Sequence, residues 1–223
     1  MDPAKGETVE KESPNTTPSS DFTPEEILNM ELERAGIPKR YRGATWENFE
    51  AKQIDAIKSA SPAEWAKLVD RLNDFKEWRG EERTLVFLTG RPGCGKTHLA
   101  VATMRRWIDA GKRGARFVVT GEFLSEMKNG FKDGTSAGVM RQAQSTKLLV
   151  LDDLGSEMAT DWVRDSMYML VNYRLNHMKP TVITSNLLLG EIAQTYHARL
   201  ASRLAGEFAI DMNILPDHRL VKS

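Results

Sequence analysis

Residues 90–97 form the group in this chain best suited to do chemistry. They read Gly-Arg-Pro-Gly-Cys-Gly-Lys-Thr and match the phosphate-binding pattern G-x-x-x-x-G-K-[ST] in full. The glycines let backbone N–H groups turn toward phosphate oxygens, and the start of a following helix adds partial positive charge. Lys96 would reach the β- and γ-phosphates, and the Thr97 hydroxyl would bind Mg²⁺. The predicted nucleotide contacts are Gly90, Arg91, Pro92, Gly93, Cys94, Gly95, Lys96, Thr97 and His98.

Two acids, Asp152 and Asp153, follow the aliphatic run Leu148–Leu151. A buried strand that ends in carboxylates is the Walker-B arrangement of ATP-hydrolysing proteins. In that arrangement Asp152 would hold Mg²⁺, and Asp153 would orient or activate the attacking water. The alternative is a chance pair of acids in a turn, and the complete phosphate-binding loop upstream favours the functional interpretation.

Asn186 follows the next apolar run, which begins at Thr181. In P-loop enzymes with an inserted strand, a polar residue at this point contacts the γ-phosphate and the attacking water, so we assign that position to Asn186. A strand-end turn is the alternative, because Asn favours turns for its own reasons.

Two arginines, Arg199 and Arg203, lie four residues apart and therefore share one face of a helix. An arginine supplied to the nucleotide of a neighbouring subunit stabilises the charge of the transition state. An ordinary solvated basic face has the same spacing, so the spacing alone leaves both interpretations open.

The elements that position these residues alternate from residue 84 onward. Apolar runs predict strands at 84–89, 115–120, 147–152, 181–184 and 207–212. Amphipathic segments predict helices at 96–110, 121–131, 136–145 and 160–178, and one or two helices at 188–205. The runs are apolar throughout, as in strands that are buried on both faces. We therefore expect an α/β fold with a parallel central sheet between two layers of helices.

The N-terminal part is organised differently. Residues 1–21 are too polar to offset the entropy of ordering and are predicted to be a disordered tail. Thr23, Pro24 and Glu26 predict a capped helix start, followed by a loop that contains Trp46 and Phe49. Helical spacing returns over 51–79 with a break at 61–62. We divide the chain into the tail, an N-terminal helix and linker (22–50), and an ATPase domain (51–223).

Composition limits the classes of function. The chain has 31 basic and 31 acidic residues, so its net charge predicts no general attraction to nucleic acid or membrane. Cys94 is the single cysteine and His98, His177, His197 and His218 lack metal-ligand spacing, so we expect neither an intramolecular disulfide nor a zinc site. No apolar run approaches the ~20 residues of a membrane helix, and no signal peptide is recognisable. We expect a cytoplasmic protein.

Several segments together carry a family resemblance. They are GRPGCGKTHLA at the phosphate-binding loop, LLVLDDLGSE at the acids, the helix start Asp161-Trp162, and then PTVITSN and RLASRLAG. With Pro38, Tyr41 and Trp46–Phe49 upstream, they resemble the DnaC/DnaI/IstB family of AAA+ ATPases, which comprises replicative helicase loaders and transposition helpers. The resemblance covers roughly residues 37–221.

This resemblance implies an AAA+ domain of the P-loop NTPase class that binds ATP and Mg²⁺ between the subunits of an oligomer. RLASRL is similar to the box VII arginine segment of the related DnaA initiator, which implies that Arg203 completes a neighbour's site and Arg199 supports it. The closing Asp217-His218-Arg219 is similar to the family's SYR ending and implies a sensor-2 role for Arg219, with His218 in place of the aromatic residue.

The resemblance also implies partners, namely a replicative hexameric helicase and the single-stranded DNA onto which it is loaded when replication starts. Two groups of residues could contact DNA: a basic cluster (Arg105, Arg106, Lys112, Arg113 and Arg116) and a mixed group (Lys128, Phe131 and Lys132). Solvated helix faces are the alternative for both. The helix at 24–35 could dock on the helicase or pack on its own core.

Three other functions compete with helicase loading. A transposition helper would engage a transposase and duplex DNA. A binding module could use ATP as a conformational switch with negligible turnover, an interpretation that Asp153 in place of the more common Glu keeps open. A metabolic kinase would need a pocket for an acceptor substrate, and the sequence after the phosphate-binding loop indicates none.

Overall fold

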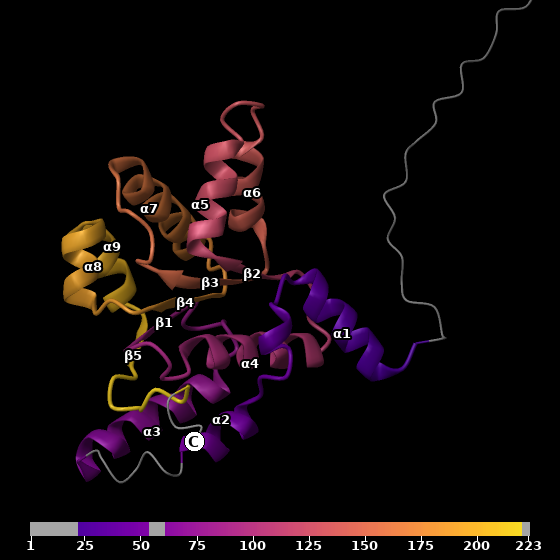
Figure 1. Cartoon of the computed structure of the whole chain (residues 1–223), viewed down its shortest axis with the longest axis vertical. Coiled ribbons are helices and arrows are strands. Elements are labelled where there is room, and N and C mark those ends of the chain that lie inside the picture. The colour runs from indigo at the N-terminus through magenta and orange to yellow at the C-terminus, as the bar shows by residue number, and fades with distance from the viewer. Residues whose placement is uncertain (1–21, 54–60, 220–223) are drawn as a thin grey trace, which may run out of the picture.

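A computed structural model describes residues 22–53 and 61–219, and a parallel sheet of five strands forms the centre of this part of the chain (Figure 1). The strands are β1 (Leu85–Thr89), β2 (Ala115–Val119), β3 (Leu148–Leu154), β4 (Thr181–Ser185) and β5 (Phe208–Asp211). Their order is β2-β3-β4-β1-β5, and each neighbouring pair is parallel. The predicted α/β class and parallel sheet are confirmed.

Helices cover both faces of the sheet (Figure 1). One layer contains α1 (Pro24–Arg34), α2 (Trp46–Gln53), α3 (Pro62–Glu77) and α4 (Lys96–Asp109), and the other contains α5 (Thr120–Asn129), α6 (Ser136–Ser145), α7 (Asp161–Asn176), α8 (Leu189–Tyr196) and α9 (Ala198–Ala205). Along β1, Val86 and Leu88 pack into the first layer, whereas Leu85 and Phe87 pack into the second. This two-sided burial explains why the strand has no polar alternation.

The strand order sets the position of the loops that carry chemistry. β4 lies between β1 and β3, so this is the inserted-strand arrangement that we expected for the sheet. Because the strands are parallel, the loop after β1, the acids in β3 and Asn186 after β4 all lie at the carboxyl edge of the sheet. Ligands of open α/β sheets bind at this edge.

Helix α1 begins as its sequence predicts. The Thr23 hydroxyl accepts a hydrogen bond from the Glu26 N–H at 3.2 Å, and the Glu26 carboxylate accepts one from the Thr23 N–H at 2.8 Å. This capping box satisfies two N–H groups that the helix start leaves free. Leu32 and Ala35 are buried, and the Ala35 carbonyl accepts a hydrogen bond from the Phe117 N–H of the edge strand β2 at 2.6 Å. The C-terminal part of the helix therefore packs on its own core.

The prediction of a loop that contains Trp46 and Phe49 is wrong in part. A short 3₁₀ helix, η1 (Lys39–Tyr41), comes first, and Trp46 and Phe49 then lie buried in α2. Thr45 and Asn48 cap this helix reciprocally: the Thr45 N–H donates to Asn48 Oδ1 at 3.0 Å, and the Asn48 N–H donates to Thr45 Oγ1 at 3.2 Å. This cap starts the helix at Trp46, upstream of residue 51, where the helical spacing of apolar residues begins.

The end of one strand also differs from the expected one, the start of one helix matches it, and some predictions fall on residues outside the description. Strand β3 was expected to end at Asp152 but continues to Leu154, because a register shift lies between Leu151 and Leu154. Helix α3 begins at the predicted break, with Ser61 as N-cap and Pro62 in its first turn. The predicted tail (1–21) and residues 54–60 lie outside the described residues.

Candidate active site

The loop between β1 and α4 has the shape that phosphate binding requires. Gly90, Gly93 and Gly95 adopt positive φ angles of 147°, 79° and 100°, which glycine accepts without strain. Lys96 and Thr97 are the first residues of α4, so they lie at the positively polarised end of a helix. The predicted positions of the loop and of its lysine within the fold are confirmed.

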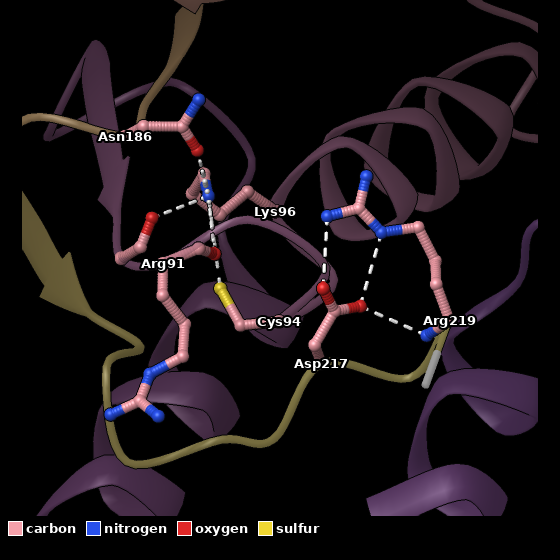
Figure 2. A network of polar contacts seen from close by, with 7 residues as sticks. Arg91, Cys94, Lys96, Asn186, Asp217 and Arg219 are labelled. Atoms are coloured by element: carbon pink, nitrogen blue, oxygen red, sulfur yellow. Dashed lines mark hydrogen bonds and ion pairs between the residues drawn. The ribbon is translucent and has the colours of Figure 1, made fainter. Parts of the chain in front are cut away.

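Lys96 is buried and makes several contacts. Its ammonium group donates to the Gly90 carbonyl at 2.6 Å, to the Arg91 carbonyl at 2.9 Å and to Asn186 Oδ1 at 2.9 Å (Figure 2). Burial lowers the pKa of Lys96. The Cys94 sulfur lies 3.8 Å from the ammonium, and burial raises the pKa of that thiol. These acceptors therefore hold Lys96 at the mouth of the loop.

Asp152 lies beside the first turn of α4. The hydroxyls of Thr97 and Thr184 both donate to Asp152 Oδ1, at 2.9 and 2.6 Å. Burial raises the pKa of Asp152, and these two hydrogen bonds oppose that rise. A hydroxyl and a carboxylate side by side fit Mg²⁺, a hard cation that takes oxygen ligands and completes its shell with phosphates and water. Thr97 and Asp152 are therefore the residues that would hold the ion.

Asp153 and Asn186 connect this group to the lysine. Asn186 Nδ2 donates to Asp153 Oδ1 at 2.9 Å, while Asn186 Oδ1 accepts from Lys96. One amide therefore joins the lysine of the loop to the second acid. Asp153 has a φ of 59°, a left-handed conformation that is uncommon for residues other than glycine. The structure thus brings together Lys96, Thr97, Asp152, Asp153 and Asn186, as their order along the sequence predicts.

The C-terminal segment, residues 213–219, lies against the phosphate-binding loop. Asn213 Oδ1 accepts from the Arg91 N–H at 2.8 Å, and the Gly93 carbonyl accepts from the His218 N–H at 3.2 Å. A Cβ atom on Gly93 would lie 1.7 Å from Asp217 Oδ1, so only glycine fits there. Sequence reasoning missed Asn213 and named Asp217 only as part of the closing segment, because nothing near them in the chain indicates a contact with residues 91–93.

Arg219 is linked to the loop through Asp217. Its guanidinium donates two hydrogen bonds, each 3.0 Å long, to Asp217 (Figure 2). These bonds are the main reason why the pKa of Asp217 lies below its ordinary value. The ion pair places one negative and one positive charge beside Gly93. A sensor-2 role for Arg219 stays a prediction.

The remaining predicted residues are dispersed. The Arg91 side chain is exposed and points away from Lys96 (Figure 2). His98 forms a hydrogen bond with the Thr45 carbonyl at 2.9 Å and lies beside Phe49, so it connects α4 to α2. Arg199 and Arg203 are exposed on α9, and neither makes an ion pair or hydrogen bond within residues 22–53 and 61–219.

Other kinds of site are not evident in the described part of the chain. Among those residues, no three His, Cys, Asp or Glu side chains are grouped so that they could hold a metal ion by themselves. None of the helices described there is long and apolar enough to cross a bilayer.

With this geometry established, comparison with known proteins identifies the family. The family model of IstB-like ATP-binding proteins matches residues 50–206. The chain belongs to this family. The IstB-like chain is 30% identical over 177 residues to YqaM of Bacillus subtilis, an uncharacterised protein, a match that covers 76% of this chain and 54% of YqaM.

Two relatives with informative names are also similar. The replicative helicase loader DnaI of Bacillus subtilis is 29% identical over 160 residues, which cover 70% of this chain and 49% of DnaI. The IstB-like chain thus spans about half the length of DnaI and of YqaM. The crystal structure of the DnaC helicase loader superposes with a TM-score of 0.63 at 27% identity, over 78% of this chain and 99% of the other. The fold is that of the AAA+ P-loop ATPases.

Proposed function

We propose that the protein is an ATP-dependent loader of a replicative hexameric helicase. One observation carries the ATPase part of this proposal: Lys96, Asn186 and Asp153 form a continuous chain of hydrogen bonds, and Thr97 and Asp152 lie next to it. These are the groups that phosphoryl transfer to water requires, namely a cation for the phosphates, oxygen ligands for Mg²⁺ and a carboxylate for the attacking water.

Each group has a defined task in this proposal. Lys96 leaves the carbonyls of its own loop and pairs with the β- and γ-phosphates of ATP. Mg²⁺, held by Thr97 and Asp152, supplies charge neutralisation when bound. Asp153 accepts a proton from water, and Asn186 keeps its carboxylate oriented through the hydrogen bond already present. Arg203 reaches the site of a neighbouring subunit.

The partner part of the proposal comes from relatives. DnaI and DnaC are named replicative helicase loaders, and the chain resembles both. The start of α1 and the residue before its cap offer a docking surface for the helicase, because Phe22 is 44% exposed, whereas Leu32 near the other end of the helix is buried. A cytoplasmic location belongs to the same proposal, because such a loader acts where DNA is replicated.

For single-stranded DNA, the structure favours the mixed group over the basic cluster. Members of the basic cluster are engaged internally: Arg105 donates to the Arg42 carbonyl, Arg113 pairs with Glu31 and Lys112 lies over the Trp107 ring. By contrast, Phe131 is 57% exposed and stands edge-on to Trp162.

Lys128 and Lys132 flank Phe131 and are exposed as well. Aromatic rings on which bases can stack, together with nearby cations for the backbone, bind single strands without sequence preference. We therefore assign DNA contact to Lys128, Phe131 and Lys132.

The ATPase part is tested with Lys96→Ala. Nucleotide affinity should fall at least about 10-fold, because a buried charge-assisted contact contributes roughly 1.5–3 kcal/mol. Titration calorimetry with ATP and Mg²⁺ measures the affinity, and a phosphate-release assay measures the turnover. Lys67→Ala, an exposed lysine on α3, is the control and should behave as wild type. Full turnover in Lys96→Ala would refute the assignment of the loop.

The partner part is tested by size-exclusion chromatography with light scattering. The chain is mixed with the replicative helicase of its host, with and without ATP and Mg²⁺. A defined co-eluting complex supports the loader. Absence of a complex in every nucleotide state contradicts it and leaves the ATPase assignment intact.

A transposition helper is the second candidate, favoured by the family model itself. Duplex DNA would then stimulate assembly of the chain in the presence of ATP, and the helicase would have no effect. Light scattering with duplex and single-stranded oligonucleotides of equal length separates the two functions.

A further inference from the structure

The two acids of the site lie in a bulge of β3. Leu151 pairs with Ile183 of β4, and the next pair is Leu154 with Ser185. Two residues of β3, Asp152 and Asp153, therefore face one residue of β4, which is Thr184. A bulge of this kind redirects side chains but removes backbone partners from the ladder.

Thr184 supplies the missing partners with its side chain. Its hydroxyl donates to Asp152 Oδ1 at 2.6 Å and accepts from the Asp153 N–H at 2.9 Å. The residue is 1% exposed, so water does not compete for these bonds. One hydroxyl thus contacts the carboxylate of the first acid and the backbone of the second.

These contacts matter because Asp153 is held in an unfavourable conformation. Its φ of 59° persists only where the surroundings stabilise it. The bond to Thr184 holds the N–H of this residue, and the bond to Asn186 holds its carboxylate. Without the hydroxyl, the N–H of Asp153 would be left unpaired, and the bulge could revert toward regular pairing.

We infer that Thr184 is the positioning residue that fixes the two acids relative to each other. Its hydroxyl orients the Asp152 carboxylate toward Thr97 and locks the backbone turn that presents Asp153 to Asn186. The inference rests on the proposed ATPase function and adds a residue to it. Thr184 itself touches neither phosphate nor water in this role.

Three variants test the inference. Thr184→Val keeps the branched shape and removes the hydroxyl, while Thr184→Ser keeps the hydroxyl. The matched control is Thr120→Val: Thr120 is also fully buried and its hydroxyl also bonds Asp152, but at the backbone carbonyl, 2.8 Å away. Thermal unfolding confirms that each variant is folded.

The first readout is the exchange rate of the Asp153 amide hydrogen, followed by NMR in the absence of nucleotide. Thr184→Val should exchange this amide at least about 10-fold faster than wild type, because its acceptor is gone. Thr184→Ser and Thr120→Val should both retain the wild-type protection. Equal protection in Thr184→Val would overturn the inference.

The second readout is turnover as a function of Mg²⁺ concentration. Loss of a group that orients a metal ligand typically costs about 10- to 100-fold in metal affinity or activity. Thr184→Val should show that loss, with ATP affinity in the absence of Mg²⁺ unchanged, and Thr184→Ser should restore turnover. An equal loss in Thr184→Ser or in Thr120→Val would reduce Thr184 to a packing role.

The two proposals fail in different ways. If wild-type turnover equals that of Lys96→Ala, the proposed ATPase function is wrong. The amide exchange of Asp153 then still decides whether Thr184 fixes the bulge.

Discussion

At the scale of single residues, the site depends on groups held in costly states. Lys96 and Asp152 are buried charged groups. Burial lowers the pKa of Lys96 and raises the pKa of Asp152, so in both cases it favours the neutral form. Their hydrogen-bond partners compensate in part for the lost hydration. Pairs of groups with shifted pKa values in one site are typical of functional sites.

Asp153→Asn tests the proposed base. Asn accepts the left-handed conformation as readily as Asp and can keep a hydrogen bond with Asn186, so the fold should be unaffected. Turnover should fall about 10²- to 10⁴-fold, because the group that takes the proton from water is removed. ATP affinity should stay within about 3-fold, as measured by calorimetry. Unchanged turnover would favour an ATP-switched binding module.

At the scale of elements, Arg174 of α7 joins segments on one side of the sheet. It is fully buried and donates to the carbonyls of Ala143 and Thr146 at the end of α6, at 2.7 and 2.9 Å. It also donates to Thr181 Oγ1 at 2.8 Å and to the Pro180 carbonyl at 2.6 Å. Burial lowers the pKa of Arg174 to about 9, so it remains charged at neutral pH.

Arg174→Met should lower the free energy of unfolding by about 3–5 kcal/mol, because several buried carbonyls lose their donor at once. Urea denaturation measures this difference. Arg164→Met is the control on the same helix: Arg164 is partly exposed, bonds the Thr195 carbonyl and pairs with Asp161, and its loss should cost about 1 kcal/mol. Similar losses in both variants would show that Arg174 is not the link between α6, α7 and β4.

At the scale of the whole molecule, we propose that the exposed arginines of α9 complete a site shared between subunits. The site described above contains a lysine and two acids, whereas Arg199 and Arg203 make no contact with them within the described ranges. In an assembly, the arginine of one subunit can complete the nucleotide site of the next. Turnover would then depend on protein concentration.

Arg203→Ala should leave unfolding free energy within about 0.5 kcal/mol of wild type, because the side chain is exposed. ATP binding by monomers should be retained, while turnover of the assembly falls by up to about 10³-fold. Mixing Arg203→Ala with Lys96→Ala subunits should restore part of the turnover, since each supplies what the other lacks. Mixtures without any recovery would show that Arg203 does not act between subunits, and Arg199→Ala tests its neighbour in the same assay.

The sequence by itself determined the features that depend on neighbouring residues. The phosphate-binding loop, the capping box of α1 and the apolar strands are all written in short stretches, because backbone conformation, capping and burial periodicity act over a few residues. The order of these stretches was enough to place Lys96, Asp152, Asp153 and Asn186 at one edge of a parallel sheet. The cap at Thr45 and Asn48 is equally local, because its two partners lie three residues apart.

Only the tertiary structure decided which distant segments meet. Three contacts join residues that are distant in the chain. They are the contacts of Thr184 with Asp152, of Asp217 with Gly93, and of Arg174 with the Ala143 carbonyl. Their contacts depend on strand register and on side-chain packing, which a local pattern does not encode. The acids of the site could therefore be named from the sequence, but the residue that holds them in place could not.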